Sequence, residues 1–472
     1  MTDSLEISVQ GERVRLPLEV LDRYNVYGPR YTSYPTAPEW KDDFGPDDFL
    51  RAFSNSEAQK EKPPVSLYFH IPFCESLCWF CGCNVIINRN KAVSNPYLDR
   101  LKIEIDRVAE GVDRARPAVQ FHWGGGTPTY LEPEQMADLY RFTSDRFNLQ
   151  PDAEIGLEVD PRVTTHEHVQ TVAELGFNRV SMGVQDFTPQ VQEAVARIQS
   201  YEQTAALVED CRANGFTSVN IDLMYGLPYQ TVASFLETVD KIIEISPDRI
   251  ALFNYAHVPQ LRHAQNAFRR MPLPQGFEKF EIFRTASERF TEAGYVFIGL
   301  DHFAKPDDEM ARAQADRTLW RNFQGYTTKA GTDLYAMGVS AISFVAGAFA
   351  QNFRDTDRYY ERLDAGTLPT MRGIWLNEDD TIRAKVIERL LCHCVLVKAE
   401  IEAEFGIDFD SYFASAIANL AQPAADGLVV LSDDRIDVTP LGRLFLRNLA
   451  MPFDSYLENK APGEKPVFSK TL

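Results

Sequence analysis

The sequence predicts an α/β fold built on a parallel sheet, with an irregular segment before it and a mainly helical domain after it. Three observations support this. Short apolar runs alternate with amphipathic stretches between residues 65 and 255, a segment rich in proline and tyrosine precedes them, and the pattern changes after about residue 365. The expected parts are an N-terminal extension over residues 1–60, a central domain over 61–365 and a C-terminal helical domain over 366–472.

The N-terminal extension contains the segment Tyr27–Thr36, which reads Tyr-Gly-Pro-Arg-Tyr-Thr-Ser-Tyr-Pro-Thr. Pro29 and Pro35 lack a backbone N–H and restrict the residues before them, so this segment is not a regular helix. We expect the extension to cover the active site of the central domain.

The central domain shows six strand-like runs separated by helical patterns. Such alternation indicates parallel strands joined by right-handed crossovers. Six units are too few for a closed eight-stranded barrel, so either an incomplete barrel or an open sheet is expected, with its active site at the carboxyl ends of the strands. The expected strands are Val65–Ile71, Val119–Trp123, Glu154–Val159, Arg179–Val184, Ser218–Met224 and Arg249–Tyr255. The expected helices are Tyr97–Val108, Pro133–Phe147, His168–Leu175, Tyr201–Asn214 and Val232–Ile245.

The C-terminal domain has the element order of a winged helix. A long amphipathic helix over Asp379–Lys398 precedes a hairpin of Gly427–Leu431 and Arg435–Thr439, and a further helix begins at Leu441. DNA binding is one interpretation of this order. The surrounding acidity favours a small structural or substrate-covering domain instead.

Composition and charge exclude several classes of function. The 472-residue chain carries 48 basic and 68 acidic side chains, a formal charge of −20, which argues against broad binding of nucleic acid or anionic membrane. The N-terminus shows no secretory signal pattern. The longest uncharged run, Leu334–Ala350, contains glycines and serines and suits a buried segment better than a membrane span. We therefore expect a cytoplasmic protein without a membrane span.

Four of the seven cysteines lie within ten positions, at Cys74, Cys78, Cys81 and Cys83. Such clustering indicates metal or redox chemistry rather than disulfides. The C-x3-C-x2-C spacing of the first three suits three irons of a [4Fe–4S] cluster, which leaves the fourth iron open to another ligand. A structural zinc site is the alternative, although zinc ligands usually come from two separated knuckles.

Strand ends add groups that suit a bound polar ligand. The segment Phe121–Thr129 runs from a strand into consecutive glycines, whose missing Cβ atoms let the backbone approach a ligand. Glu158, Gln185 and Asp222 each stand at the end of a later strand. Each of them alone could equally cap the next helix, but three on one rim indicate a site that binds hydroxyl and amino groups.

With these motifs the chain resembles the radical S-adenosylmethionine (SAM) superfamily, in which Phe80 before Cys81 also fits. Within it the chain resembles the oxygen-independent coproporphyrinogen III dehydrogenases of haem biosynthesis, from about Tyr24 into the C-terminal region. The segments that carry this closer resemblance are Tyr24–Thr36, His70–Cys74, His122–Tyr130, Phe177–Phe187, Phe253–His257, Asp301–Ala304 and Arg321–Thr328.

The resemblance implies a fold and a reaction. The fold would be an incomplete, three-quarter parallel β/α barrel of the radical SAM type. The activity would be oxidative decarboxylation of two propionates of coproporphyrinogen III to vinyl groups by a 5′-deoxyadenosyl radical, giving protoporphyrinogen IX. The implied cofactors are one [4Fe–4S] cluster and two molecules of SAM, and the implied partners are the tetrapyrrole and a small redox protein that donates electrons. The family also implies a monomer.

The resemblance also implies site residues. Cys74, Cys78 and Cys81 would ligate the cluster, and Cys83 would not. Because the cofactor carries the radical, no side chain is assigned as catalytic, and Tyr68, His70 and Glu158 are candidate positioning residues. His70 alone could also be an iron ligand or a proton donor. The cluster-bound SAM would contact Tyr68, Gly125, Glu158 and Ile342, and the second SAM would contact Phe80, Gly126, Thr127, Gln185, Arg197, Asp222 and Ala256.

Some residues and alternatives stay open. Arg30 and Arg321 are candidates for contacts with propionates. Cys392 and Cys394 have no role in the family, and their spacing on a helix does not place them on one face. The main rival function is that of a haem chaperone of the same superfamily, which binds haem without turnover. Such chaperones typically lack the fourth cysteine and the opening segment, and this chain has both.

Overall fold

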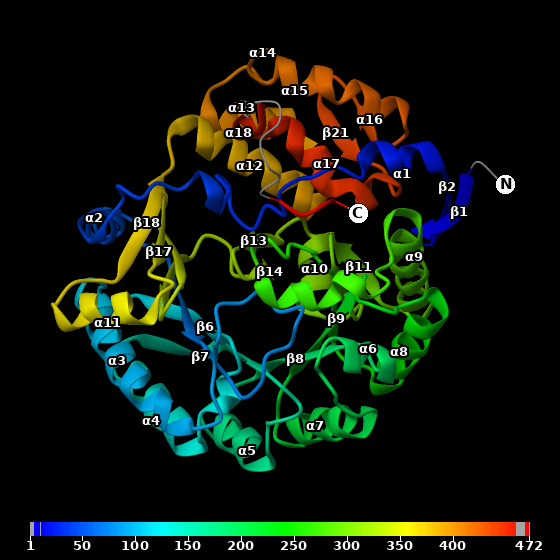
Figure 1. Ribbon diagram of the computed structural model, residues 1–472. Helices are drawn as coiled ribbons and strands as arrows, with labels where there is room; N and C mark the ends of the chain where they lie inside the picture. The colour runs from blue at the N-terminus through cyan, green and yellow to red at the C-terminus, as the bar shows by residue number, and fades with distance from the viewer. Residues whose placement is uncertain (1–3, 10, 459–467, 472) are drawn as a thin grey trace.

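The centre of the molecule is a strongly curved mixed sheet (Figure 1). The computed structural model describes residues 4–9, 11–458 and 468–471. Within them the sheet has twelve strands, in the order β11-β12-β10-β9-β8-β7-β6-β3-β15-β16-β17-β18. Its edge strands, β11 and β18, stand at opposite ends of this order, so the described sheet is an incomplete barrel.

Seven neighbouring strands of this sheet are parallel. All six strands expected from the sequence are confirmed, and β15 is the seventh. They are β3 (Val65–Ile71), β6 (Pro117–Gly125), β7 (Asn148–Val159), β8 (Arg179–Gln185), β9 (Ser218–Tyr225), β10 (Arg249–Asn254) and β15 (Asp333–Met337).

Antiparallel strands extend the sheet at both ends. The uncharged run Leu334–Ala350 forms most of β15, β16 (Ile342–Val345) and β17 (Ala348–Asn352), and β18 (Thr370–Trp375) follows as the edge strand. At the other end lie β12 (His302–Ala304) and β11 (Val296–Gly299). No helix in the described part of the chain is long and apolar enough to cross a membrane. The sheet continues through β18, beyond residue 365, and the expected domain boundary there stays a prediction.

Helices cover the outer, convex side of the sheet (Figure 1). Three of them begin at N-caps of a residue type that can be recognised in the sequence. The hydroxyls of Thr165, Ser200 and Thr231 accept hydrogen bonds from backbone N–H groups of the first turn. The helices are α3 (Asn95–Glu110), α4 (Pro133–Ser144), α5 (His166–Glu174), α6 (Pro189–Ala194), α7 (Tyr201–Ala213), α8 (Val232–Ile245), α9 (Gly276–Glu292) and α11 (Thr356–Asp364). The short helix α10 (Glu309–Ala315) instead borders the interior, where Met310 lines the large cavity.

Strand alternation decides which side chains reach the interior. In β3, Leu67 and Phe69 belong to the core between sheet and helices, whereas Tyr68 and His70 line the interior cavity. The same alternation holds in β7, where Ile155 is in the core and its neighbours Glu154 and Gly156 line the cavity, because successive side chains point to opposite faces. The fold thus buries apolar groups under the helices and leaves polar groups for the inside.

The N-terminal and C-terminal regions share a second hydrophobic core. Figure 1 shows the first elements beside the last ones, at the top of the molecule. The N-terminal elements are β1 (Ser4–Val9), β2 (Glu12–Pro17), α1 (Leu18–Tyr24) and, against the sheet edge, α2 (Pro46–Glu57). The contact positions the segment Tyr27–Thr36 between the barrel and the C-terminal region.

The C-terminal region has the arrangement of a winged helix, with strands ordered β19-β21-β20. The helix expected over Asp379–Lys398 ends earlier, at His393, because Cys394 adopts a left-handed conformation and the chain turns into a strand. The elements are α12 (Glu378–His393), β19 (Val395–Val397), α13 (Lys398–Phe405), α14 (Phe409–Tyr412), α15 (Ala414–Asn419), α16 (Ala421–Ala425), β20 (Val429–Leu431), β21 (Arg435–Val438), α17 (Leu446–Ala450) and α18 (Ser455–Glu458).

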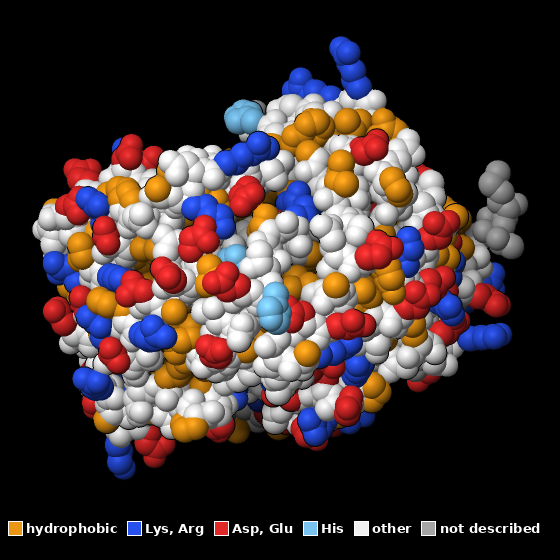
Figure 2. Space-filling view, turned by 90° about the horizontal axis from the view of Figure 1, so that it is seen from below, with side chains coloured by type: hydrophobic (Ala, Val, Ile, Leu, Met, Phe, Trp, Pro, Cys, Tyr) orange, Lys and Arg blue, Asp and Glu red, His pale blue; other side chains and the backbone are white. Residues whose placement is uncertain are grey.

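The surface carries both signs of charge. Figure 2 shows acidic and basic side chains interspersed over the face seen from below, with a hollow near its middle. On this face the net charge of −20 is therefore spread out rather than gathered into one patch.

Candidate active site

Two neighbouring cavities lie inside the curved sheet. The larger has a volume of about 650 Å³ and the smaller about 170 Å³. Both are lined by residues at the carboxyl ends of the parallel strands, and they share the lining residues Cys83, Gly125, Glu158, Ser181 and Asp222. A ligand in the small cavity would therefore adjoin one in the large cavity.

The cysteine loop forms one wall of the small cavity. Cys74 ends the short strand β4 (Phe73–Cys74), which pairs with β5 (Ile86–Ile87). Cys78 and Cys81 follow in a turn closed by a hydrogen bond from the Cys81 N–H to the Cys78 carbonyl, 3.0 Å long. These three and Cys83 all line the cavity, and each has a free thiol.

Neighbouring side chains prepare the cysteines for metal binding, which requires the thiolate. Arg162 and Arg197 each place a guanidinium nitrogen 3.5 Å from the Cys78 sulfur. A hydrogen bond with Cys83 lowers the pKa of Cys81 to about 6, whereas burial raises that of Cys74 to about 11. The loop therefore favours negative charge at part of the cysteine set before any metal binds.

The geometry of this wall suits a cluster. Among the described residues, no three His, Cys, Asp or Glu side chains converge as ligands of a single ion. In a cubane cluster each thiolate binds a different iron, so three cysteines along one wall can serve as its ligands. Three cysteines around one buried wall, beside two arginines, fit a [4Fe–4S] cluster.

The glycine turn packs directly on the chain that leads into the cysteine loop. The N–H groups of Gly126 and Thr127 donate to the carbonyls of Ile71 and Phe73, both at 2.8 Å. A Cβ atom on Gly126 would stand 2.7 Å from the Phe73 carbonyl oxygen, and Gly125 has φ +112°. Only glycine lets these two backbone segments meet, and the contact leaves backbone groups along both cavities.

His70 fastens the cysteine loop to the barrel. Burial lowers its pKa, so the ring is neutral. Its Nε2 lies 2.9 Å from the Asn84 carbonyl and its Nδ1 lies 3.3 Å from the Tyr68 hydroxyl, so Nε2–H donates and Nδ1 accepts. Because both nitrogens have partners, the geometry favours the positioning role among the three interpretations of His70.

Two carboxylates from β7 and β9, on either side of β8, have different charge states. Burial disfavours the charged form of Glu158, but His122 and the Gly125 N–H at 3.0 Å outweigh burial and lower its pKa. Burial, followed by the charge of Glu158, raises the pKa of Asp222 to about 7. The site thus offers one firm acceptor and one group that can donate or accept near neutral pH.

Unpartnered polar atoms mark the far side of the small cavity. The buried Oε1 of Gln185 and Nε of Arg197 lack hydrogen-bond partners within the described structure. Gln185 also has φ +72°, a left-handed conformation that costs free energy in a residue other than glycine. Buried polar groups are usually paired, so these atoms indicate a polar ligand.

The structure brings most of the expected site residues together. Ile342 and Tyr68 line only the large cavity, and Ala256 lines neither. Gln265 nevertheless links Ala256 to Phe80, since its Nε2 lies 3.2 Å and 3.4 Å from their carbonyls. The expected residues that line the small cavity are Cys74, Cys78, Phe80, Cys81, Gly125, Gly126, Thr127, Glu158, Gln185, Arg197 and Asp222.

The two arginines expected to bind propionates lie outside the lining of the large cavity. Arg30 donates to the Asn254 carbonyl at 2.6 Å and lines a separate, smaller cavity. Arg321 in β13 (Trp320–Asn322) places its guanidinium 4.9 Å from the centre of the Tyr326 ring, in the neighbouring β14 (Gly325–Thr327).

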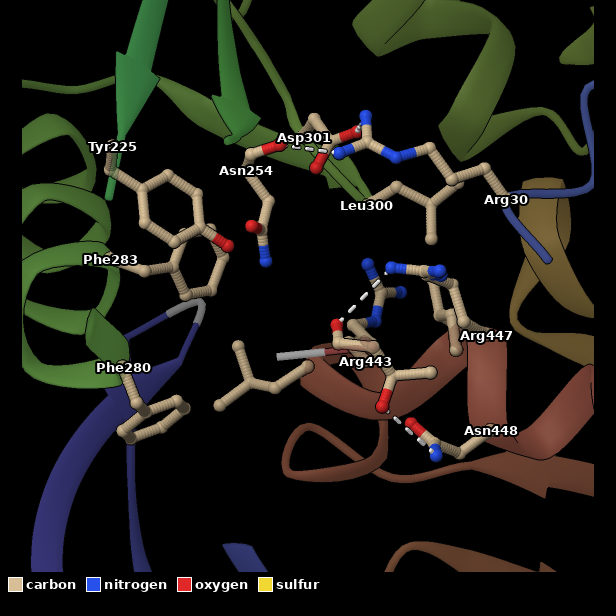
Figure 3. Close-up of a pocket in the computed structure, with 13 residues that line it drawn as sticks. Arg30, Tyr225, Asn254, Phe280, Phe283, Leu300, Asp301, Arg443, Arg447 and Asn448 are labelled. Atoms are coloured by element: carbon tan, nitrogen blue, oxygen red, sulfur yellow. Dashed lines mark hydrogen bonds and ion pairs between the residues drawn. The ribbon is translucent and has the colours of Figure 1, made fainter. Parts of the chain in front are cut away.

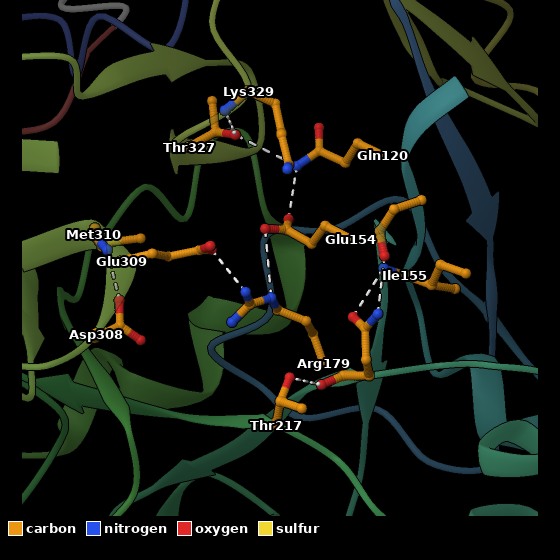
Figure 4. A network of polar contacts seen from close by, with 12 residues as sticks. Gln120, Glu154, Ile155, Arg179, Thr217, Asp308, Glu309, Met310, Thr327 and Lys329 are labelled. Carbon is orange, nitrogen blue, oxygen red and sulfur yellow. Dashed lines mark hydrogen bonds and ion pairs between the residues drawn. The ribbon is translucent and has the colours of Figure 1, made fainter. Parts of the chain in front are cut away.

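Sequence reasoning missed the arginines that do line the large cavity. At its base, Arg179 and Arg249 share Glu309 at 2.7 Å and 3.0 Å. Figure 4 shows this network continuing from Arg179 to Glu154 and Gln120. The signal in the sequence was the presence of charged residues at alternating positions of otherwise apolar strands.

A second group of arginines lines the cavity without such pairing. Arg262, Arg354 and Arg372 form no ion pair with a carboxylate of the described residues, and the Arg372 Nε donates to Gln351 at 2.9 Å. Burial, followed by the charge of Arg262, lowers the pKa of Arg354, and burial, followed by Arg354, lowers that of Arg372. These three cations therefore crowd one another around a space that suits negative charge.

Comparisons with known proteins agree with this site. A family described as the radical SAM superfamily matches residues 68–242, and one described as the HemN C-terminal domain matches residues 376–445. The oxygen-independent coproporphyrinogen III oxidases of Pseudomonas aeruginosa and Escherichia coli are each 46% identical to this chain, over 94% and 98% of it and 97% and 99% of their own length. The solved structure described as coproporphyrinogen III oxidase (HemN) from Escherichia coli, a radical SAM enzyme, superposes with a TM-score of 0.89 at 44% identity, covering 96% of this chain and all of that one.

Proposed function

The chain belongs to the family of oxygen-independent coproporphyrinogen III oxidases, and we propose that it converts coproporphyrinogen III into protoporphyrinogen IX in haem biosynthesis. The observation that carries the proposal is the junction of two cavities, one walled by cysteines and one of about 650 Å³. The larger volume lies within the range of sites that enclose a sizeable organic ligand.

The cofactors would occupy the small cavity and its junction with the large one. Cys74, Cys78 and Cys81 would bind three irons of a [4Fe–4S] cluster, and Tyr68, Gly125, Glu158 and Ile342 would hold a SAM molecule at the remaining iron. When bound, these cofactors supply a carbon radical that removes a hydrogen from the substrate propionate. The unpartnered atoms of Gln185 and Arg197 support a second SAM, held with Phe80, Gly126, Thr127, Asp222 and Ala256.

The chain's own residues position these ligands and manage charge. Glu158, kept ionised by His122 and the glycine turn, would accept from an ammonium or hydroxyl group. Asp222, with its pKa near 7, would do the same once a cationic ligand favours its charged form. His70 would keep the cysteine loop against β3 and would not itself exchange a proton.

The unpaired arginines would hold the carboxylates of the substrate. Coproporphyrinogen III carries four propionates, so its binding needs cations that are not already neutralised. Arg262, Arg354 and Arg372 meet that requirement, whereas Arg179 and Arg249 are occupied by Glu154, Asp308 and Glu309. Guanidinium groups suit this role because they pair with carboxylates in a fixed, bidentate geometry.

We further propose a cytoplasmic monomer that receives electrons from a small redox protein. Seven free cysteines fit a reducing compartment. The family resemblance supports the monomer and the donor.

The test is anaerobic turnover. The protein is loaded with iron and sulfide, reduced and given SAM and coproporphyrinogen III, and the oxidised porphyrins are then separated. SAM-dependent protoporphyrin with a tricarboxylate intermediate is expected. Tight binding of haem with no decarboxylated product would favour the haem chaperone, and a colourless protein containing zinc would overturn the cluster assignment.

A further inference from the structure

A small enclosed cavity of about 30 Å³ lies where the N-terminal segment, the barrel and the C-terminal region meet (Figure 3). Its walls come from all three parts, with Arg30 from the first, Asn254 and Asp301 from the second, and Arg443 and Arg447 from the third. It shares no lining residue with the two cavities of the proposed active site.

The walls carry more positive than negative charge. Three guanidinium groups, those of Arg30, Arg443 and Arg447, stand against the single carboxylate of Asp301, which lies 3.7 Å from Arg30. Arg447 donates hydrogen bonds to backbone carbonyls, including that of Pro29 at 2.9 Å. Because these carbonyls carry no net charge, the charge of Arg447 stays uncompensated. Buried charges without a counter-charge are costly, so this excess calls for an anion.

Nearby side chains respond to the same positive field. Burial, followed by the charges of Arg30 and Arg447, lowers the pKa of Lys279 to about 7. Its side-chain nitrogen donates to the Tyr255 carbonyl at 3.0 Å. The region therefore disfavours a further cation, in a chain whose overall charge is −20.

Two buried donors at this cavity make no hydrogen bond of good geometry within the described residues, although the Asn254 side chain adjoins the Tyr225 hydroxyl. They are the Nδ2 of Asn254, a residue only 7% exposed, and a terminal nitrogen of Arg443. Figure 3 shows the Asn254 amide nitrogen directed into the space between the Tyr225 ring and Arg443. A buried donor without an acceptor destabilises the folded state, so a bound acceptor would stabilise both groups at once.

Size limits what the acceptor can be. A volume of about 30 Å³ holds one small particle and excludes an organic acid or a phosphate ester. The Asp301 carboxylate and the unpartnered Oδ1 of Asn448 also line the cavity and would repel an anion, so only a compact ion can contact the arginines without contacting these oxygens. We propose that this cavity is a binding site for one small inorganic anion such as chloride, which ties the N-terminal segment and α17 to the end of β10. The proposal does not depend on the proposed function.

Thermal unfolding of the full chain tests this site. The melting temperature is measured at constant ionic strength while gluconate, which is too large for the cavity, is replaced by chloride or bromide. A saturable rise of about 1–3 °C is expected for both halides. An equal melting temperature in gluconate and halide would mean that the cavity holds water only and would overturn the inference.

Variants assign any halide effect to this cavity. Arg443→Gln removes one unpaired guanidinium and should abolish the halide response, whereas Arg435→Gln, at an exposed pair with Asp437, should retain it. If Arg443→Gln does not fold, Asn254→Leu removes the other unpartnered donor and should flatten the response. In crystals grown with bromide, an anomalous peak between Asn254 and Arg443 is expected, and a bromide-responsive protein without that peak would contradict the proposal.

Discussion

The base and the arginine-rich wall of the large cavity use the same residue type in opposite ways. At the base, Arg179 and Arg249 are paired with carboxylates from β7 and from the start of α10. On the other wall, Arg262, Arg354 and Arg372 have no carboxylate partner among the described residues. The paired set closes the inside of the barrel and stabilises the fold. The unpaired set costs stability and keeps positive charge available, as a binding site for an anionic substrate requires.

The largest expected effect comes from replacing the cysteines that would ligate the cluster, because the arginine-rich wall would hold substrate for a reaction that depends on that cluster. Cys74→Ser, Cys78→Ser or Cys81→Ser should each abolish iron binding and reduce turnover by more than about a thousandfold, because three irons need three thiolates. Iron content, the visible spectrum and SAM cleavage measure this.

Cys83→Ser is the matched control for those variants. It lies on the same loop and lines the same cavity, yet should retain the cluster. A Cys83→Ser protein without iron would show that the three-ligand assignment is wrong.

Removing one of the paired arginines at the base of the cavity should mainly reduce the stability of the fold. Arg179→Met leaves Glu154 without its only ion-pair partner in the described structure and should lower the free energy of unfolding by about 2–4 kcal/mol. Denaturant titration measures the loss. Arg289→Met, at an exposed pair with Asp240, should cost less than about 1 kcal/mol, and equal losses for the two variants would remove the contrast between base and surface.

Neutralising the unpaired set should affect binding without loss of stability. Arg262→Gln and Arg354→Gln should each raise KM for coproporphyrinogen III by about tenfold, equivalent to about 1.4 kcal/mol, with little change in kcat. Melting temperatures should stay level or rise, because mutual repulsion is relieved. Steady-state kinetics at several salt concentrations check this, and an unchanged KM in both variants would place the propionates elsewhere.

The smallest expected effect is a pH dependence at Asp222. Its pKa in the folded state, about 7, lies above the usual value of a free carboxyl, so the folded state holds this proton more tightly. Stability from this group is present at low pH and is lost as pH rises towards and through 7.

Asp222→Asn should therefore reduce the pH dependence of unfolding between about pH 5 and 8 by about 1–2 kcal/mol in cofactor-free protein. This range is below the full pKa shift because Asp222 borders an open cavity. Unfolding titrations at both pH values measure it, and an identical slope in the variant would mean that another group titrates there.

Much of the fold was predictable because local pattern and burial agree. The strands β3 and β6 to β10 are short apolar runs between helical patterns, and their cores pack as that pattern requires. Leu334–Ala350 was predicted to be buried, but its three strands were not predicted, since an uncharged run without periodicity does not distinguish a helix from strands. The hairpin of β1 and β2 was also missed, because it packs on α9, far along the chain, where the Ser8 N–H donates to Glu288 at 2.7 Å.

For the site, motifs found the cysteine loop, the glycine turn and the strand-end carboxylates, because those residues follow one another along the chain. That reasoning could not identify the arginines that line the large cavity. Arg262, Arg354 and Arg372 come from three separate segments and meet only in the folded barrel. From its motif, Arg30 was a candidate for a contact with a substrate propionate, whereas in the structure its guanidinium donates to the Asn254 carbonyl.

The hydrogen bonds of Arg447 determine which parts of the chain can be lost or exchanged independently of each other. Its guanidinium contacts the carbonyls of Gly28 and Pro29 on one side and that of Lys470 on the other, while the Gly28 N–H donates to Ser469 at 3.1 Å. Segments more than 400 positions apart in the sequence are thus joined by one hydrogen-bond network. Deleting the C-terminal region would release the opening segment as well, so we expect the two to be gained and lost together among radical SAM proteins, as a single heritable unit.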